Sequence, residues 1–159
     1  MEPYDIEERH EDLFQDTPRF QQAAWGKRLA NLFIDRIAFM GFLFLIGILL
    51  GLVYPPSAET FRSIADNRIV DLLLTSLLYA VYMGAQEALF NGKTLGKLIT
   101  KTRAVFEDGS SITASAAFTR GICRVVPFEP FSALGNPTYP WHDRWSHTVV
   151  VDEGETTWA

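Results

Sequence analysis

The chain has 159 residues, enough for one domain, and its formal net charge at pH 7 is −5. Its basic residues are scattered, so we expect no nucleic-acid partner. The single cysteine, Cys123, excludes an intramolecular disulfide and any multi-cysteine metal site, and we expect it to be a small packing residue.

Residues 1–20 contain seven acidic side chains and two arginines, with little apolar surface to bury. We expect a mobile acidic tail there, a membrane domain over residues 21–152 and a frayed end over 153–159. A secretory signal begins with basic residues before a short apolar core, and this acidic start is the opposite. The first apolar segment after this tail should therefore be retained in the protein rather than cleaved as part of a signal peptide.

The eighteen residues 37–54 carry no charged and no strongly polar side chain. As a helix they would rise about 27 Å, close to the roughly 30 Å of a bilayer's hydrocarbon core. Helical periodicity extends this helix back to about Ala23, with Trp25 at the headgroup level, and Pro55 should end it. We predict that residues 32–54 cross a membrane.

A short polar connection, residues 54–68, leads to a second apolar block at 69–90. The centre of this block is uncharged, with Asp71 near one end and Glu87 near the other, and its length suffices for a second span. The dipeptide Asn91-Gly92 follows where a helix commonly ends.

Shorter elements are predicted in the rest of the chain. Thr94 can cap a short helix, and Thr113 can cap a helix over 114–126, which the following proline ends. Two β-type runs, 102–107 and 148–152, are the obvious partners of each other.

The segment 114–134 is apolar in part, but it contains Arg120, Arg124 and Glu129. A central arginine costs about 2.5–3.5 kcal/mol on membrane-insertion scales, so two arginines and an acid outweigh the apolar residues. We expect an interfacial or re-entrant helix, buried against the two spans, rather than a third span.

Pairing of the two β-type runs places both on one side of the membrane, which favours an even number of crossings. Seven lysines and arginines flank the spans within residues 19–28 and 91–103, against two in the connection between the spans. The positive-inside rule therefore predicts a multi-pass protein with both termini in the cytoplasm.

Arg28, Asn31 and Asp35 share one helix face near that boundary. In one interpretation they form an anchoring belt in which Asp35 pairs with Arg28 or Arg36. In the other, Asp35 and Glu87 share an ion or proton site, because two carboxylates in a low-dielectric cleft raise one pKa, as a proton-coupled carrier needs. The residues alone favour the structural interpretation.

Gly47 and Gly51 form a small-xxx-small pattern, which lets another helix approach closely. Homodimerisation is one reading of the pattern. The favoured reading is ordinary packing against the second span, through Gly84 and Ala85.

His142 and Asp143 are neighbours, and His147 follows at a spacing that suits a metal ligand. A catalytic triad also needs a nucleophile within reach, however, and a zinc site needs three or four ligands. No phosphate loop, dinucleotide fingerprint, metalloprotease helix or nucleophile elbow occurs. We therefore expect no enzymatic activity, no metal and no cofactor.

Arg120 and Arg124, four residues apart, should lie on one face of a helix. They could face phosphates, or they could pair with the carboxylates of Asp35, Glu87 or Asp143.

Three sequence blocks in order resemble the RDD family of bacterial integral membrane proteins, named for one arginine and two aspartates: GKRLANLFIDRIAF, EALFNGKTLGKLITKTRAVFEDGSSIT and WHDRWSHTVVV. The resemblance covers about residues 21–152 and implies that the family's arginine is Arg28 and its aspartates are Asp35 and Asp143. It also implies a location in the bacterial inner membrane. The chain departs from the family at His147, where glycine is common, and its proline-rich stretch before the closing block is shorter than a span. The family has no settled biochemical role, and some members have been proposed as sodium/proton antiporters.

Together, these features predict an α-helical integral membrane protein with two long transmembrane helices, interfacial or re-entrant helices and a short cytoplasmic β-pair. We expect six charged side chains to converge at the cytoplasmic boundary: Arg28, Asp35, Glu87, Arg120, Arg124 and Asp143.

Two functions are compatible with this prediction. The protein is either a component of a cation or proton transport oligomer, or a scaffold or assembly module that binds a partner protein and uses its charges to hold its own fold. The expected partners are the lipid bilayer and a second copy or another membrane protein. An enzyme acting on lipid headgroups has only His142 and Asp143 in its favour.

Overall fold

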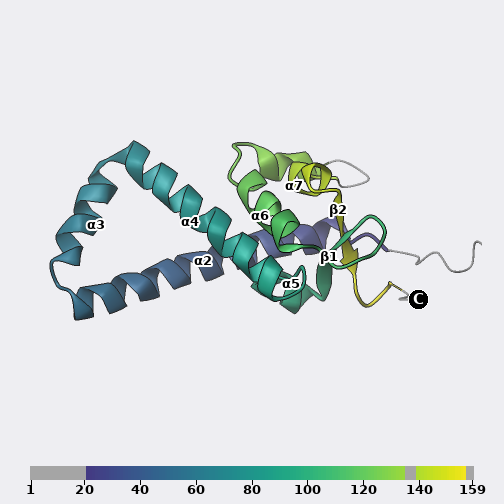
Figure 1. Ribbon diagram of the computed structural model, residues 1–159, viewed down its shortest axis with the longest axis horizontal. Coiled ribbons are helices and arrows are strands. Elements are labelled where there is room, and N and C mark those ends of the chain that lie inside the picture. The colour runs from purple at the N-terminus through teal and green to yellow at the C-terminus, as the bar shows by residue number, and fades with distance from the viewer. Residues whose placement is uncertain (1–20, 135–138, 157–159) are drawn as a thin grey trace, which may run out of the picture.

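A computed structural model describes residues 21–134 and 139–156 of the protein (Figure 1). The predicted tail 1–20 and the last residues, 157–159, lie outside the described residues. Helices dominate the fold, and the elements follow in the order α2 (Trp25–Val53), α3 (Ser57–Asp66), α4 (Arg68–Leu89), α5 (Leu95–Thr100), β1 (Thr102–Phe106), α6 (Ala114–Cys123), the 3-10 helix η1 (Glu129–Leu134), α7 (Trp141–Trp145) and β2 (Thr148–Asp152).

The two long helices, α2 and α4, are the candidate membrane spans. They contain 29 and 22 residues, so their lengths are about 43 and 33 Å, enough to cross a hydrocarbon core. In the most apolar stretch of each, only 6% and 28% of the residues are buried, whereas the core helix of a soluble protein is mostly buried. Their outward apolar surface is therefore suited to lipid, in agreement with the two predicted spans.

The polar connection between the spans contains the ten-residue helix α3, which was not predicted from the sequence. The reason lies in the proline pair after α2. Proline ends a helix, but it also suits the start of the next one, and Pro56 stands at the N-cap of α3. Glu59, in the first turn, adds a favourable interaction with the helix dipole.

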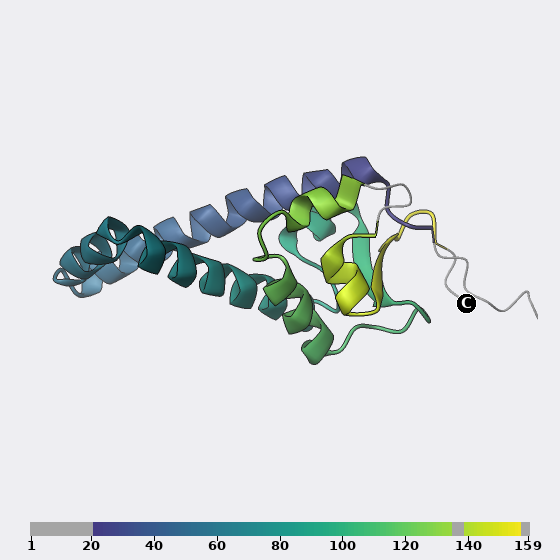
Figure 2. The same cartoon turned by 90° about the horizontal axis from the view of Figure 1, so that it is seen from above.

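The short elements after α4 pack together at one end of the long helices, and we call this part, residues 92–134 and 139–156, the head (Figures 1 and 2). Strands β1 and β2 pair antiparallel, from Thr102 opposite Asp152 to Phe106 opposite Thr148, so the two predicted β-type runs do form a pair. The start of α2 joins the same unit, because the Ala23 N–H donates to the Val150 carbonyl at 2.9 Å.

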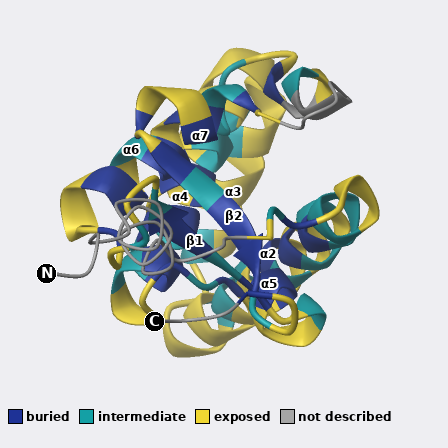
Figure 3. Cartoon of the chain, turned by 90° about the vertical axis from the view of Figure 1, so that its right-hand side faces the viewer, coloured by how far each residue is buried: buried dark blue, intermediate teal, exposed yellow. Residues whose placement is uncertain are grey.

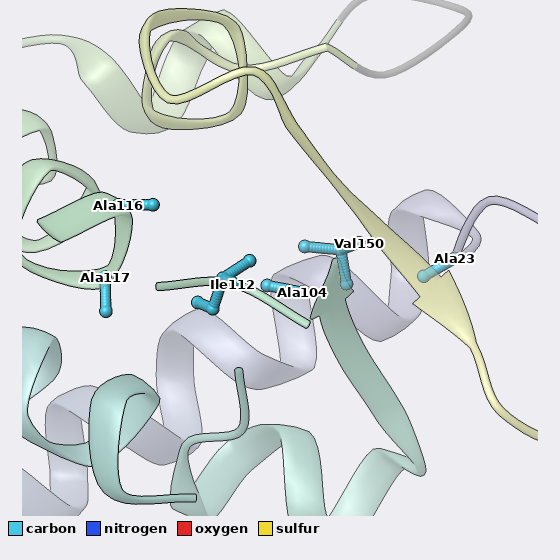
Figure 4. Close-up of a cluster of buried hydrophobic side chains, with 6 residues drawn as sticks. All are labelled: Ala23, Ala104, Ile112, Ala116, Ala117 and Val150. Carbon is cyan, nitrogen blue, oxygen red and sulfur yellow. The ribbon is translucent and has the colours of Figure 1, made fainter. Parts of the chain in front are cut away.

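A small apolar core holds the head together, and Figure 3 shows that buried residues gather at this end of the molecule. Its side chains are small or β-branched, which lets the strands, α6 and the start of α2 approach closely. Figure 4 shows the members: Ala23, Ala104, Ile112, Ala116, Ala117 and Val150.

Helix α6 packs against α4, as expected for the 114–126 helix, but it ends at Cys123. Its start is as predicted, since the Thr113 hydroxyl accepts from the Ala116 N–H at 3.3 Å. With ten residues, α6 reaches about 15 Å, too short to cross a membrane. Within the described residues, α2 and α4 are the only helices long and apolar enough to do so.

The contact between α2 and α4 is aromatic, with the ring centroid of Phe39 5.1 Å from that of Tyr79 and the centroid of Phe42 5.1 Å from that of Tyr82. The predicted packing of Gly47 and Gly51 against the second span is wrong, because a Cβ added at either glycine would meet no heavy atom within 4 Å.

The face of α4 that carries Gly84 is occupied instead by α6, since a Cβ at Gly84 would lie 2.7 Å from a ring carbon of Phe118.

The predicted frayed end, residues 153–159, begins with a residue that makes two ion pairs. Glu153 pairs with Lys93 at 2.8 Å and with Arg103 at 3.0 Å.

The α4–α6 contact predicts the effect of Gly121→Ala. A Cβ at Gly121 would lie 2.3 Å from the Ala80 carbonyl oxygen, so the helices must separate. Forced overpacking typically costs about 1–3 kcal/mol, and we expect the unfolding free energy in detergent to fall by that amount. Gly47→Ala is the control and should leave stability unchanged; an equal loss in both variants would contradict this packing.

Candidate functional site

Arg120 lies at the centre of a buried network of ion pairs in the head, and its side chain has no exposed surface. Its Nε donates to Glu87 Oε2 at 2.6 Å, and its Nη1 donates to Asp143 Oδ1 at 2.6 Å. The hydroxyl oxygen of Thr148 on β2 accepts a further short hydrogen bond from Nη1. One guanidinium therefore connects α6 to α4, α7 and β2.

Three more cations complete the network. Glu87 Oε1 accepts from Lys97 Nζ at 2.8 Å and from Arg124 Nη2 at 3.0 Å. Arg28 Nη1 donates to Asp143 Oδ2 at 2.6 Å. The ion-pair network thus contains Arg28, Glu87, Lys97, Arg120, Arg124 and Asp143 and joins both candidate spans to the head.

Local structure explains how these side chains meet. Arg120 and Arg124 are one helical turn apart, so both reach the same carboxylate of Glu87 from one side of α6. Arg28, in the first turn of α2, lies beside β2, where its Nη2 donates to the Val150 carbonyl at 3.3 Å.

Asp35 lies outside the network, and its hydrogen-bond partners are neither Arg28 nor Arg36, with one of which a pairing was predicted. Its two oxygens accept from the Thr94 hydroxyl and from the Gly96 N–H, each at 2.7 Å. Asp35 therefore binds the start of α5. Arg36 instead lies over the ring of Tyr79, with its guanidinium carbon 4.4 Å from the ring centroid.

A glycine is required where α5 meets α2. A Cβ at Gly96 would lie 2.8 Å from the Asn31 carbonyl oxygen and 3.0 Å from a carboxylate oxygen of Asp35. Asn31 adds side-chain hydrogen bonds to Thr100, at 2.6 Å, and to Thr102, at 3.0 Å. Two residues of the polar face predicted on α2, Asn31 and Asp35, thus bind α5 and β1, whereas Arg28 on the same face binds Asp143.

The charges of the network stabilise one another. Burial alone would raise the pKa of Asp143, but the charges of Arg120, His142 and Arg28 hold it well below its usual range. Burial lowers the pKa of Lys97 to about 8, although the Glu87 carboxylate opposes this change. Burial opposes the charge of Arg124 as well, but Glu87 overcomes it and raises the pKa of Arg124. The network is therefore charged at neutral pH, with Lys97 its most easily discharged member.

His142 and Glu129 form a separate buried pair beside the network. His142 Nδ1 and Glu129 Oε1 share a short hydrogen bond, and His142 Nε2 lies 3.4 Å from Asp143 Oδ1. Burial and the charge of Arg124 lower the pKa of His142 to about 4. The Ser146 hydroxyl donates to the backbone carbonyl of His142 rather than to its ring, so it is not placed as a nucleophile.

Other catalytic or metal-binding arrangements have little support. Within residues 21–134 and 139–156, no group of three histidine, cysteine or acidic side chains could hold a metal ion. Cys123 is a free, buried thiol whose pKa is raised by burial.

Lys97 and Glu129 belong to the site, but sequence reasoning missed their roles. Lys97 was counted only among the lysines and arginines that flank the spans. Glu129 was counted only as a charged residue that disfavours a third span. A signal for Lys97 was its place inside an apolar helical turn, Leu95–Ile99, three residues after a threonine cap.

Two cavities adjoin the network, and Arg124 lines both. One, of about 70 Å³, lies between α2 and the end of the head that contains Glu129 and His142. The other is a groove of about 530 Å³ along α4, lined by Arg36, Asp71, Tyr79 and other residues.

Comparison with known proteins identifies one relationship. The model of the RDD family matches residues 22–149, which includes both candidate spans and nearly all of the head. No curated protein and no solved structure matches the chain significantly.

The geometry predicts that Glu87→Gln is strongly destabilising. The change leaves Lys97, Arg120 and Arg124 without their shared counter-charge, and breaking a buried ion pair from one side typically costs about 3–5 kcal/mol. Chemical unfolding in detergent measures the loss. The control is Asp71→Asn at the far end of α4, which should lose less than about 1 kcal/mol; equal losses would show that the network does not hold the fold.

Proposed function

We propose that this chain, which belongs to the RDD family, is a non-enzymatic membrane module. In this proposal the ion-pair network fastens the two spans to the head, and the spans assemble with those of a second copy. The network's charges serve the fold itself, and the spans present the surface that acts on other proteins.

One observation carries the structural role of the charges: both carboxylate oxygens of the buried residues Asp35, Glu87 and Asp143 already accept a hydrogen bond from the protein. Asp35 is occupied by Thr94 and Gly96, Glu87 by three cations and Asp143 by two. An ion carrier needs carboxylate oxygens that can exchange protein donors for the ion. Here such an exchange would break contacts between the spans and the head.

The open glycine face of α2 supports assembly through the spans. A Cβ at Gly47 or Gly51, which are one helical turn apart, would meet nothing within 4 Å, so this face has no partner helix among the described residues. Small residues let helix backbones approach closely in lipid. A two-fold interface uses the same patch on both subunits, so one glycine face is complementary to its own copy.

The proposal places the head in the cytoplasm of a bacterial cell. The head carries Lys93, Lys97, Lys101 and Arg103, whereas the other end of the spans carries Arg62 on α3 and Arg68 at the start of α4. This asymmetry supports the orientation by the positive-inside rule.

The assembly is tested by intact mass in mild detergent. We expect wild type to run as a homo-oligomer, and Gly47→Leu with Gly51→Leu to shift it toward the monomer, because leucine side chains keep the copies apart. Because a Cβ at either glycine meets no heavy atom within 4 Å among the described residues, the variant should still fold, which its circular dichroism spectrum verifies.

The matched control is Leu52→Ile together with Val53→Ile, at positions 76% and 82% exposed at the end of the same helix. A monomeric wild type, or an oligomer unaffected by the glycine substitutions, would contradict the proposed interface.

A component of a cation or proton transport oligomer is the second candidate. It is favoured by the position of Arg124, which lines both the groove along α4 and the cavity in the head and donates to Glu87. In this reading a transported ion approaches the network through the groove or through the cavity.

Asp35→Asn distinguishes the two functions. Asparagine can still accept from the Gly96 N–H, and its amide can donate to the Thr94 hydroxyl, so the fold should remain while the charge is lost. The structural proposal expects no ion-dependent proton flux in vesicles containing either protein. Flux through wild type that disappears in folded Asp35→Asn would favour transport instead.

A further inference from the structure

The cavity of about 70 Å³ in the head has one cationic side and one apolar side. It lies between the first turns of α2 and the Glu129–His142 pair, and the surrounding helices can be followed in Figure 2. A buried water needs about 10–15 Å³ by this measure, so the space suits a group of several heavy atoms.

Three cations line the cationic side: Arg28, Lys97 and Arg124. Their side chains are only 7%, 2% and 9% exposed, so they are held in place by the fold rather than free in solvent. Arg124 Nε is buried and has no hydrogen-bond partner in the described part of the chain. An unsatisfied buried donor costs about 1–3 kcal/mol, which an acceptor oxygen in the cavity would recover.

Cations outnumber carboxylates in the cavity lining, where Arg28, Lys97 and Arg124 face the single carboxylate of Glu129. The four cations of the network share the carboxylates of Glu87 and Asp143, and Asp35 is bound by uncharged donors. Glu129 shares a hydrogen bond with the ring of His142. The like charges of Arg120 and Arg124 help to lower the pKa of Lys97, so an added anion would relieve this repulsion.

The apolar side is formed by α2, through Trp25, Leu29 and Leu32. Trp25 is 46% exposed and stands at the start of the candidate span, where a tryptophan marks the headgroup level of a bilayer. The cavity therefore combines cations that suit phosphate oxygens with apolar walls that suit the attached glycerol and upper acyl chain.

We propose that this cavity binds a phosphate group, presented by a phospholipid headgroup at the membrane surface or as free phosphate from solution. Arg28, Lys97 and Arg124 contact the phosphate oxygens, and Trp25, Leu29 and Leu32 contact the apolar part of a lipid. This inference is independent of oligomerisation and of transport.

The test measures binding to the delipidated full-length protein in mild detergent by native mass spectrometry. The probes are phosphatidylglycerol, inorganic phosphate and diacylglycerol, which lacks the phosphate. We expect one tightly bound phosphatidylglycerol per chain and no comparable binding of diacylglycerol. Equal binding of the two lipids would overturn the proposal, because the cations would then contribute nothing.

Leu32→Trp fills the cavity without changing a charge, and we expect it to weaken binding of the phosphate probe at least tenfold. Ile37→Trp is the matched control, since Ile37 is 69% exposed on the same helix and lies outside the cavity lining. The melting temperature of each variant verifies its fold, and Leu29→Trp replaces Leu32→Trp if the latter does not fold. Equal affinities in the cavity variant and the control would overturn the proposed site.

Competition with inorganic phosphate distinguishes a phospholipid headgroup from free phosphate as the group that binds in the cavity. If phosphatidylglycerol binds and millimolar phosphate does not displace it, the site is a lipid site. If phosphate binds and raises the melting temperature of wild type but not of Leu32→Trp, while the lipid does not bind specifically, the site takes free phosphate. If neither probe binds wild type, the proposal is wrong.

Discussion

The burial of the Arg120 guanidinium is the constraint on which the rest of the structure depends. An arginine without exposed surface must be paired, because a charge removed from water is costly unless counter-charges and hydrogen bonds replace the solvent. Its counter-charges, Glu87 and Asp143, lie on α4 and α7, and Asp143 in turn holds Arg28 on α2. The charge of one residue therefore fixes the positions of elements that are far apart in sequence.

This constraint also explains why the spans contact each other so little. The network and the α4–α6 packing hold each span to the head, so stability does not require an extensive α2–α4 interface beyond the Phe39–Tyr79 region. The outer faces of both helices, including Gly47 and Gly51, thus remain available to lipid and to other helices. The head provides the specific geometry, and in the proposed function the spans provide membrane attachment and the surface for assembly.

Much of the fold could be predicted from local sequence signals. The apolar runs predicted both spans, Thr94 and Thr113 marked the starts of α5 and α6, and the two β-type runs form the strand pair. The partners of the charges were less predictable, because the contacts of Lys97 with Glu87 and of Asp35 with Gly96 depend on how α5 folds back on the spans. Helix α3 was missed because the proline pair was interpreted only as a stop.

The central claim, that the family's charged residues hold the spans to the head, is tested most directly by a double-mutant cycle on Arg28 and Asp143. The unfolding free energy is measured for wild type, Arg28→Gln, Asp143→Asn and the double variant. The account predicts a coupling energy of at least about 1.5 kcal/mol, because the two side chains form a buried ion pair at 2.6 Å. Additive losses, or single variants that keep wild-type stability, would contradict it.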